Sequence, residues 1–126
     1  MSCVMRVVAH GRSILLSADI EADVEAALTT GGASLASDIL VAPHHGSKTS
    51  STPAFLDAVK PKSIVIPVGY RNRFRHPAPD VMERYRQSGA RLLRTDRDGA
   101  VTLRFGPAAI DAEAYRTRHA RYWHAR

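Results

Sequence analysis

The sequence predicts an α/β layered domain, and three observations support this prediction. Short apolar runs rich in β-branched residues recur along the chain. Segments with apolar residues at helical spacing separate them, and proline, glycine or polar clusters end most of these segments. The 126 residues fit one small domain, and a hydrophobic fraction of 44% allows a modest core.

The N-terminal part of the chain predicts a hairpin followed by a helix. Residues 4–9 alternate loosely and predict a strand, residues 10–13 a turn, and residues 14–16 a second strand. Residues 20–30 then carry apolar side chains at helical spacing, with acidic residues near the start that suit the helix dipole. The glycine pair at 31–32 ends this helix.

The middle of the chain predicts two buried strands joined by a short helix. The apolar residues 38–42 form the first strand, which stops at a proline followed by two histidines and a glycine. Thr52 and Pro53 cap and open a helix that runs to Val59. Residues 63–68 form the second strand, which leads into an arginine-rich loop.

The C-terminal part predicts a helix, a hairpin and a tail. Pro79 starts a helix that runs to about Gln87. Residues 91–95 and 100–105 predict two strands around an Asp-Arg-Asp-Gly turn, which favours a hairpin. The composition changes after residue 106, so we expect a domain over residues 1–106. Residues 107–126 are basic and predict a loosely ordered tail, with a helix or a nucleic-acid contact as alternatives.

Charge and composition narrow the possible partners. The net charge is +6, and 15 of the 18 basic residues are arginine, the side chain suited to bidentate phosphate contacts. This balance favours a polyanion, either nucleic acid or an anionic membrane surface. No apolar run approaches the roughly 20 residues that span a bilayer, and no signal peptide is visible. We therefore expect the chain itself to be soluble.

Three polar segments each follow a predicted strand and could meet at one edge of the sheet. They contain Asp19, the adjacent pair His44 and His45, and His76. A carboxylate with two or three imidazoles suits Mn²⁺ and is compatible with Zn²⁺. Asp19 could bridge two ions about 3.5–4 Å apart, as two-metal hydrolases require.

Each of these residues also has a structural alternative. Asp19 could be the N-cap of the helix that follows, and His76 could be a turn residue before Pro77. One of His44 and His45 could be held in hydrogen bonds without touching a metal. The hydroxyl groups after the histidines could bond backbone in a turn or contact a phosphate; they belong to Ser47, Thr49 and Ser50.

Four stretches together carry a family resemblance. Residues 14–21 resemble the motif LLTGD-I-E, residues 43–51 resemble PHHGS-x-TSS, residues 69–77 resemble G-x-x-N-x-(F/Y)-x-HP, and residues 94–100 resemble RTDRDGA. This set is similar to the metallo-β-lactamase-like domain of ComEC-type DNA-uptake (competence) proteins. The resemblance covers roughly residues 2–105. It implies an αββα sandwich of mixed sheets between helices, built from two similar halves.

The resemblance also implies an activity and a set of roles. The family domain is expected to be a di-metal nuclease that uses Mn²⁺ or Zn²⁺ and cleaves the DNA strand that is not imported. Asp19 would bridge the metals, and His44 or His45 would bind the second one. His76 would be an active-site residue, and His45 could transfer a proton instead of binding metal. DNA contacts would come from Ser47, Lys48, Thr49, Arg71, Arg73 and Arg75, with further arginines up to Arg97 along the backbone path.

Two departures from the family pattern limit what this chain is expected to do alone. Ala18 stands where the family usually has glycine, and the N-terminal metal motif His-x-(His/Asp)-x-Asp-His is absent. The chain thus resembles the C-terminal half of the domain, a mixed sheet with helices on one face. We expect it to bind metal poorly and to be inactive by itself. The uncovered apolar surface of half a sandwich predicts a homodimer.

The parent protein of such a domain would contain the membrane channel that this chain lacks, in the inner membrane with this domain in the periplasm. Two other functions remain open from the sequence. One is a non-catalytic nucleic-acid-binding module with the same fold. The other is a metallo-hydrolase acting on a small phosphate or ester.

Overall fold

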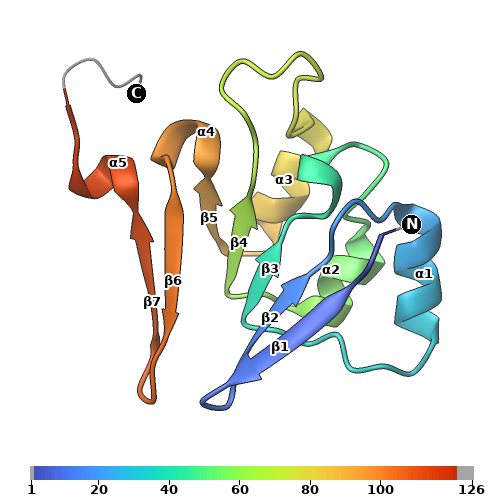
Figure 1. Cartoon of the computed structure of the whole chain (residues 1–126). Coiled ribbons are helices and arrows are strands. Elements are labelled where there is room, and N and C mark those ends of the chain that lie inside the picture. The colour runs from blue at the N-terminus through green and yellow to red at the C-terminus, as the bar shows by residue number, and fades with distance from the viewer. Residues whose placement is uncertain (1, 122–126) are drawn as a thin grey trace.

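The computed structural model describes residues 2–121. In them the chain forms a five-stranded mixed sheet and a separate two-stranded sheet (Figure 1). Helices pack on one face of the larger sheet, and the smaller sheet packs on the other. This confirms the predicted α/β class and the mixed sheet with helices on one face. Within the described part of the chain, no helix is long and apolar enough to cross a membrane.

The larger sheet has the order β1-β2-β3-β4-β5. β1 is antiparallel to β2, and the remaining neighbours are parallel. The strands are β1 (Met5–Ala9), β2 (Arg12–Leu16), β3 (Ile39–Val41), β4 (Ser63–Ile66) and β5 (Arg91–Arg94). The predicted N-terminal hairpin is confirmed. Because β2 to β5 are parallel, the loops that follow them leave from the same edge of the sheet.

Three helices cover one face of this sheet, and local signals set where two of them begin. They are α1 (Ala22–Thr30), α2 (Pro53–Val59) and α3 (Pro79–Gln87). Proline occupies the first turn of α2 and of α3, where its missing N–H costs nothing. The Thr52 hydroxyl accepts a hydrogen bond from the Phe55 N–H at 3.3 Å and so caps α2.

Alternation along the central strands sorts the core into two clusters. In β4, Ile64 and Ile66 belong to the helix-side cluster, which also holds Phe55. Val65 lies between them in sequence and packs in the other cluster, with Leu93. Successive strand residues point to opposite faces, so a strand that is apolar throughout is buried on both.

The second sheet consists of β6 (Val101–Phe105) and β7 (Ile110–Ala114), which are antiparallel. The predicted hairpin between residues 91–95 and 100–105 is therefore wrong. β5 pairs with β4 as a fully parallel strand, and Thr95–Asp98 forms a short helix, α4. Burial of Leu93 between the layers outweighs the local turn signal.

The expectation of a loosely ordered tail is also corrected over part of its length. Residues 110–114 are a strand because Ile110 and Ala112 pack against the cluster of the larger sheet. A short helix, α5 (Tyr115–Arg118), follows. The Arg12 guanidinium donates to the carbonyls of Gly106, Pro107 and Ala108 and ties the two sheets together. The predicted tail residues 122–126 lie outside the described residues.

Apolar side chains at one end of the larger sheet are exposed. Met5, Val7 and Val8 of β1 are 53%, 41% and 55% exposed, and Leu16 of β2 is 38% exposed. β1 is also an edge strand of the sheet. This surface offers apolar area to a partner, and the predicted homodimer remains a prediction.

Candidate active site

Two segments meet at the carboxyl edge of the sheet: the turn after β2 and the histidine loop, which we define as residues 43–51. The His44 N–H donates to the Ala18 carbonyl at 2.9 Å, and the Ala22 N–H donates to the Thr49 carbonyl at 2.9 Å. These backbone bonds hold Asp19 beside the histidines. The alternative of Asp19 as a helix cap is wrong, since α1 begins at Ala22 with Glu21 as its N-cap.

Consecutive residues of the histidine loop have left-handed backbone geometry. The φ angles are 49° at His44 and 56° at His45, and Gly46 follows at 79°. Such angles at residues other than glycine cost of order 1–3 kcal/mol each and cluster at functional sites. Ala18, directly before Asp19, is also left-handed with φ 51°. The glycine of the resembling motif would adopt this conformation without that cost.

His45 forms the clearest functional pair, with Asp19. The ring nitrogen Nδ1 of His45 lies 2.7 Å from the Pro67 carbonyl oxygen, which can only accept, so Nδ1–H donates. In the neutral ring this leaves the Nε2 lone pair free, and Nε2 lies 3.6 Å from Oδ1 of Asp19. Both side chains are more than half exposed. A nitrogen lone pair and a carboxylate oxygen here can share a cation or a proton.

His44 is placed differently, beside Glu21. Its Nδ1 lies 3.3 Å from Oε1 of Glu21, which is within ion-pair distance. The two atoms are not aligned for a hydrogen bond, and Nδ1 is buried without another hydrogen-bond partner among the described residues. An unsatisfied buried nitrogen is unusual in a folded protein. The nearest charged neighbour of His44 is the Glu21 carboxylate.

His76 joins the same edge from the arginine loop, which we define as residues 69–77. Its ring centre lies 6.0 Å from that of His44. Partial burial, and then the neighbouring His44 and His45 rings, hold the pKa of His76 below its usual value. The ring is thereby kept neutral near neutral pH.

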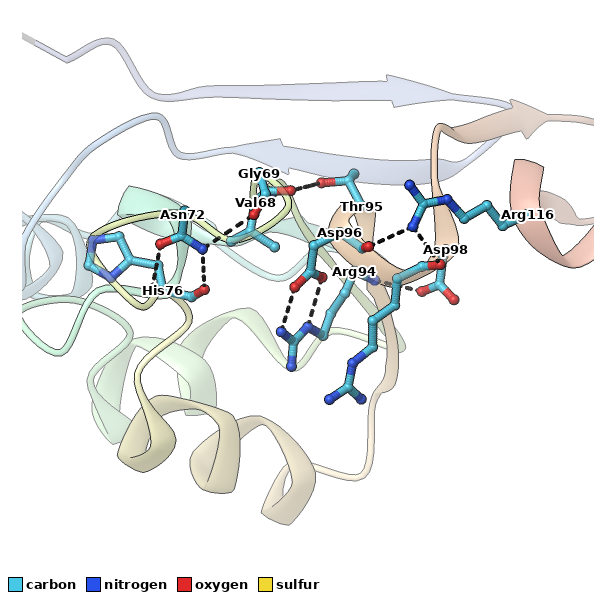
Figure 2. Close-up of polar contacts among 10 residues, drawn as sticks. Val68, Gly69, Asn72, His76, Arg94, Thr95, Asp96, Asp98 and Arg116 are labelled. Carbon is cyan, nitrogen blue, oxygen red and sulfur yellow. Dashed lines mark hydrogen bonds and ion pairs between the residues drawn. The ribbon is translucent and has the colours of Figure 1, made fainter. Parts of the chain in front are cut away.

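Asn72 fixes the backbone of His76, a role that the residue pattern does not predict. Its Oδ1 accepts from the His76 N–H at 2.8 Å, and its Nδ2 donates to the His76 carbonyl at 2.8 Å (Figure 2). Asn72 thus fixes the backbone of His76, while the His76 ring lies near that of His44. The asparagine of the resembling motif was the available signal.

The donor groups form pairs rather than a complete metal site. Asp19 with His45 and Glu21 with His44 are the close pairs. Among residues 2–121, no three histidine, cysteine, aspartate or glutamate side chains are grouped so that they could hold one ion. These residues alone thus supply only part of the two-metal set expected for the whole domain, and metal binding remains a prediction.

Some of the residues after the histidines make hydrogen bonds within the turn, and others are exposed to solvent. The buried Ser50 hydroxyl lies 3.0 Å from the Pro43 carbonyl and 2.9 Å from the Ser47 carbonyl, which share its one proton, so it bonds backbone in the turn. The Ser47 hydroxyl lies 3.1 Å from that of Thr49 and is itself buried. Lys48 and Thr49 are exposed and remain accessible to a phosphate.

A buried carboxylate, that of Glu25, supports the end of the histidine loop. The sequence predicts Glu25 only as one of the acidic residues at the start of a helix. Glu25 is fully buried and accepts from the backbone N–H groups of Ser51 and Thr52. The Ser51 hydroxyl bonds the Tyr85 hydroxyl at 2.5 Å. Burial raises the pKa of Tyr85 to about 12, so this hydroxyl stays protonated.

The segment resembling RTDRDGA braces the fold, and the expected DNA path along its arginines remains a prediction. Arg94 makes a bidentate pair with Asp96 at 3.1 and 2.7 Å (Figure 2). The Thr95 hydroxyl donates to the Val68 carbonyl and accepts from the Val68 N–H, both at 2.8 Å. Arg116 donates to the Asp96 carbonyl at 2.7 Å. These contacts fix the end of β4, from which the arginine loop leaves.

The arginine loop itself is open to solvent. Arg71, Arg73 and Arg75 are all exposed. The Arg71 guanidinium lies 5.2 Å from the Tyr70 ring centre, and that of Arg73 lies 4.9 Å from the Phe74 ring centre. The predicted DNA-contact arginines are thus accessible, next to the histidines.

The fold and this edge define a class: an α/β domain with histidine and carboxylate side chains at the carboxyl ends of parallel strands. No protein-family model matches the chain. The chain is 42% identical over 123 residues to Competence protein ComA of Neisseria gonorrhoeae. The aligned region covers 97% of this chain and 18% of that protein.

Two further relatives have related names. The chain is 34% identical over 127 residues to Recombination protein 2 of Haemophilus influenzae, covering 99% of this chain and 16% of that protein. It is 32% identical over 104 residues to ComE operon protein 3 of Bacillus subtilis, covering 82% of this chain and 13% of that protein. The chain therefore spans less than a fifth of the length of these curated relatives.

Proposed function

We propose that this chain is part of a metal-dependent hydrolase domain that cleaves phosphodiester bonds of DNA in a protein of DNA uptake. The observation that carries the proposal is the Asp19–His45 pair, whose His45 ring is oriented by the Pro67 carbonyl. The exposed arginines of the adjacent loop suit a polyanionic substrate. The names of the relatives, a competence protein and a recombination protein, support a role in the handling of DNA.

In this proposal the residues of the chain have separate tasks. His45 holds or accepts a proton at Nε2, and Asp19 supplies the negative charge that stabilises a cation or an imidazolium there. Arg71, Arg73 and Arg75 neutralise phosphates of the strand. A divalent ion such as Mn²⁺ or Zn²⁺, when bound, would activate water and stabilise charge on the phosphate. Its remaining donors would come from another part of a longer protein, which would also carry the membrane channel and place this domain in the periplasm.

A second candidate function is a nucleic-acid-binding module without catalysis. The specific observation that favours it is the arginine loop, whose two exposed aromatic rings lie under arginine guanidinium groups. Such a loop can bind a strand without any metal. Binding would then weaken as salt rises but would not respond to divalent ions at equal ionic strength.

Calorimetric titration of Mn²⁺ and Zn²⁺ into this chain separates the two candidates. The hydrolase proposal expects weak binding that an Asp19→Ala, His45→Ala double variant abolishes and a control His119→Ala variant keeps, since His119 is exposed and stacks on Tyr115. In a longer protein that contains the chain, the same double variant should lose metal-dependent DNA cleavage by 100-fold or more, on the order of general acid–base effects. Cleavage that survives the double substitution would overturn the hydrolase proposal.

A further inference from the structure

Two aromatic rings of the arginine loop lie outside the core. Tyr70 is 59% exposed and Phe74 is 66% exposed. Exposed rings bury little apolar area on folding, and these two lie within five residues of three exposed arginines. Burial in the fold therefore does not explain their presence. Exposed rings among arginines are the composition that binds bases and phosphates together.

The loop is ordered before any partner arrives. Asn72 bonds both backbone groups of His76, and its Nδ2 also reaches the Gly69 carbonyl at 3.4 Å. The Arg75 N–H donates to the Asn72 carbonyl at 3.2 Å. Phe74 stacks on the His76 ring with centres 5.8 Å apart and planes 18° apart. A ring that is already placed loses little conformational entropy when it binds.

A cleft of about 400 Å³ opens beside Phe74, within the size range of small-molecule sites. Pro67, Val68 and Phe74 supply apolar walls, and His45 and His76 stand at its side. Two of the polar groups that line it are already engaged: Thr95 bonds Val68, and Asn72 bonds His76. The apolar walls suit the flat face of a ring better than a charged phosphate.

We propose that the arginine loop is a base-stacking platform for single-stranded nucleic acid. Unpaired bases take the faces of Tyr70 and Phe74 that the Arg71 and Arg73 guanidinium groups cover in the free chain. One base reaches into the cleft, and the released guanidinium groups, with that of Arg75, bind the intervening phosphates. A duplex cannot bind in this way, because its base faces are already stacked on each other. His45 lines the same cleft, so the strand is led past the Asp19–His45 pair.

This inference rests on the proposal that the site acts on nucleic acid, and it names the form of the substrate. It does not depend on catalysis or on a metal. The test is therefore run with a chelator present, so that loss of metal binding and loss of base stacking are seen separately.

The experiment measures fluorescence anisotropy of a labelled single-stranded oligothymidine and of a labelled duplex, with the chain and its variants. A Tyr70→Ala, Phe74→Ala double variant should bind the single strand at least about 10-fold more weakly, since stacking contributes about 1–3 kcal/mol per base. Its binding to duplex should change less than about 2-fold, and the salt dependence should stay the same because no charge is lost. A Tyr70→Trp, Phe74→Trp variant should retain single-strand binding.

Two controls complete the test. Tyr115→Ala removes another exposed aromatic ring, 52% exposed and far along the chain, and should leave both affinities unchanged. A triple variant should bind both single strand and duplex more weakly, and its affinity should depend less on salt. It carries Arg71→Gln, Arg73→Gln and Arg75→Gln. Equal losses on single strand and duplex for the aromatic double variant, or no loss on either, would overturn the platform. If the aromatic double variant loses single-strand binding as expected but the calorimetry detects no metal binding, the stacking inference stands and the hydrolase proposal does not.

Discussion

The two loops that form the candidate site are built in different ways. The histidine loop is fixed from below by buried groups: Ser50 bonds carbonyls within the turn, and Glu25 accepts from the backbone at its end. The arginine loop is fixed by the side chain of Asn72 and leaves Tyr70 and Phe74 in solvent. The first loop is anchored by buried side chains, and the second lies at the surface.

This difference separates positioning from contact. The histidine loop keeps His44 and His45 in left-handed geometry, which only a well-packed surround can maintain. The arginine loop holds the Tyr70 and Phe74 rings in place outside the core. These rings are therefore available to a partner. Stability should therefore respond to changes under the histidine loop, and binding to changes in the arginine loop.

The largest effect is expected from Glu25→Ala. The change removes the carboxylate that accepts from the Ser51 and Thr52 N–H groups, leaves both donors unpaired and opens a cavity. We expect a loss of about 3 kcal/mol in the free energy of unfolding, because charged hydrogen bonds and unpaired buried donors each contribute on that order. Urea denaturation followed by circular dichroism measures it.

The matched control for this change is Asp23→Ala, an exposed acidic residue in the first turn of the same helix. It should lower the free energy of unfolding by no more than about 0.5 kcal/mol. Equal losses from the two variants would show that Glu25 does not support the histidine loop.

Gly46→Ala should come next, because Gly46 is where the two loops touch. An added Cβ would lie 2.5 Å from Cβ of Pro77, and φ at Gly46 is +79°. We expect a loss of about 2 kcal/mol or more, from a left-handed alanine and a steric overlap. Gly89→Ala shares the left-handed geometry, with φ +77° and nothing within 4 Å of the added Cβ. Gly89→Ala should lower the free energy of unfolding by only about 1 kcal/mol. If Gly46→Ala lowers it by no more than this control, the two loops are not in tight steric contact at Gly46.

The sequence predicted the elements that depend on local signals. Prolines mark the starts of α2 and α3, and alternation or apolar runs mark β1 to β5. It also predicted that Asp19 and the histidines follow strands and share an edge, which parallel pairing enforces. These features need only neighbouring residues and one rule of topology.

What the sequence missed depends on contacts between distant segments. Glu25 finds its partners 26 and 27 residues away, so its helical position alone suggested exposure. The strand β7 alternates Ile110 and Ala112 with acidic residues, but its apolar side chains are short and its partner cluster lies in the other sheet. The turn signal after β5 was real as a local preference and gave way to α4 because β5 was already paired with β4.

A smaller effect on stability, with a clear effect on local order, is expected from Asn72→Ala. The change removes the two bonds to the His76 backbone and the bond to the Gly69 carbonyl. Since these groups are near solvent, the free energy of unfolding should fall by only about 1 kcal/mol. Amide hydrogen exchange of the arginine loop should accelerate while that of the histidine loop stays unchanged. Faster exchange in both loops would contradict their separate construction.

The smallest effect is the titration of His76, which reports how close the two loops are. Partial burial is the largest cause of its lowered pKa, followed by the charges of His44 and His45. A His44→Gln variant should therefore raise the pKa of His76 only part of the way to its usual value, as measured by NMR titration. The sign for stability follows: because the folded-state pKa lies below the unfolded value of about 6.5, the unfolded chain binds more protons between the two. The contribution of His76 is present above that unfolded value and is lost as pH falls through the folded pKa. An unchanged His76 titration in the His44 variant would mean that the loops are farther apart in solution than the 6.0 Å between these rings.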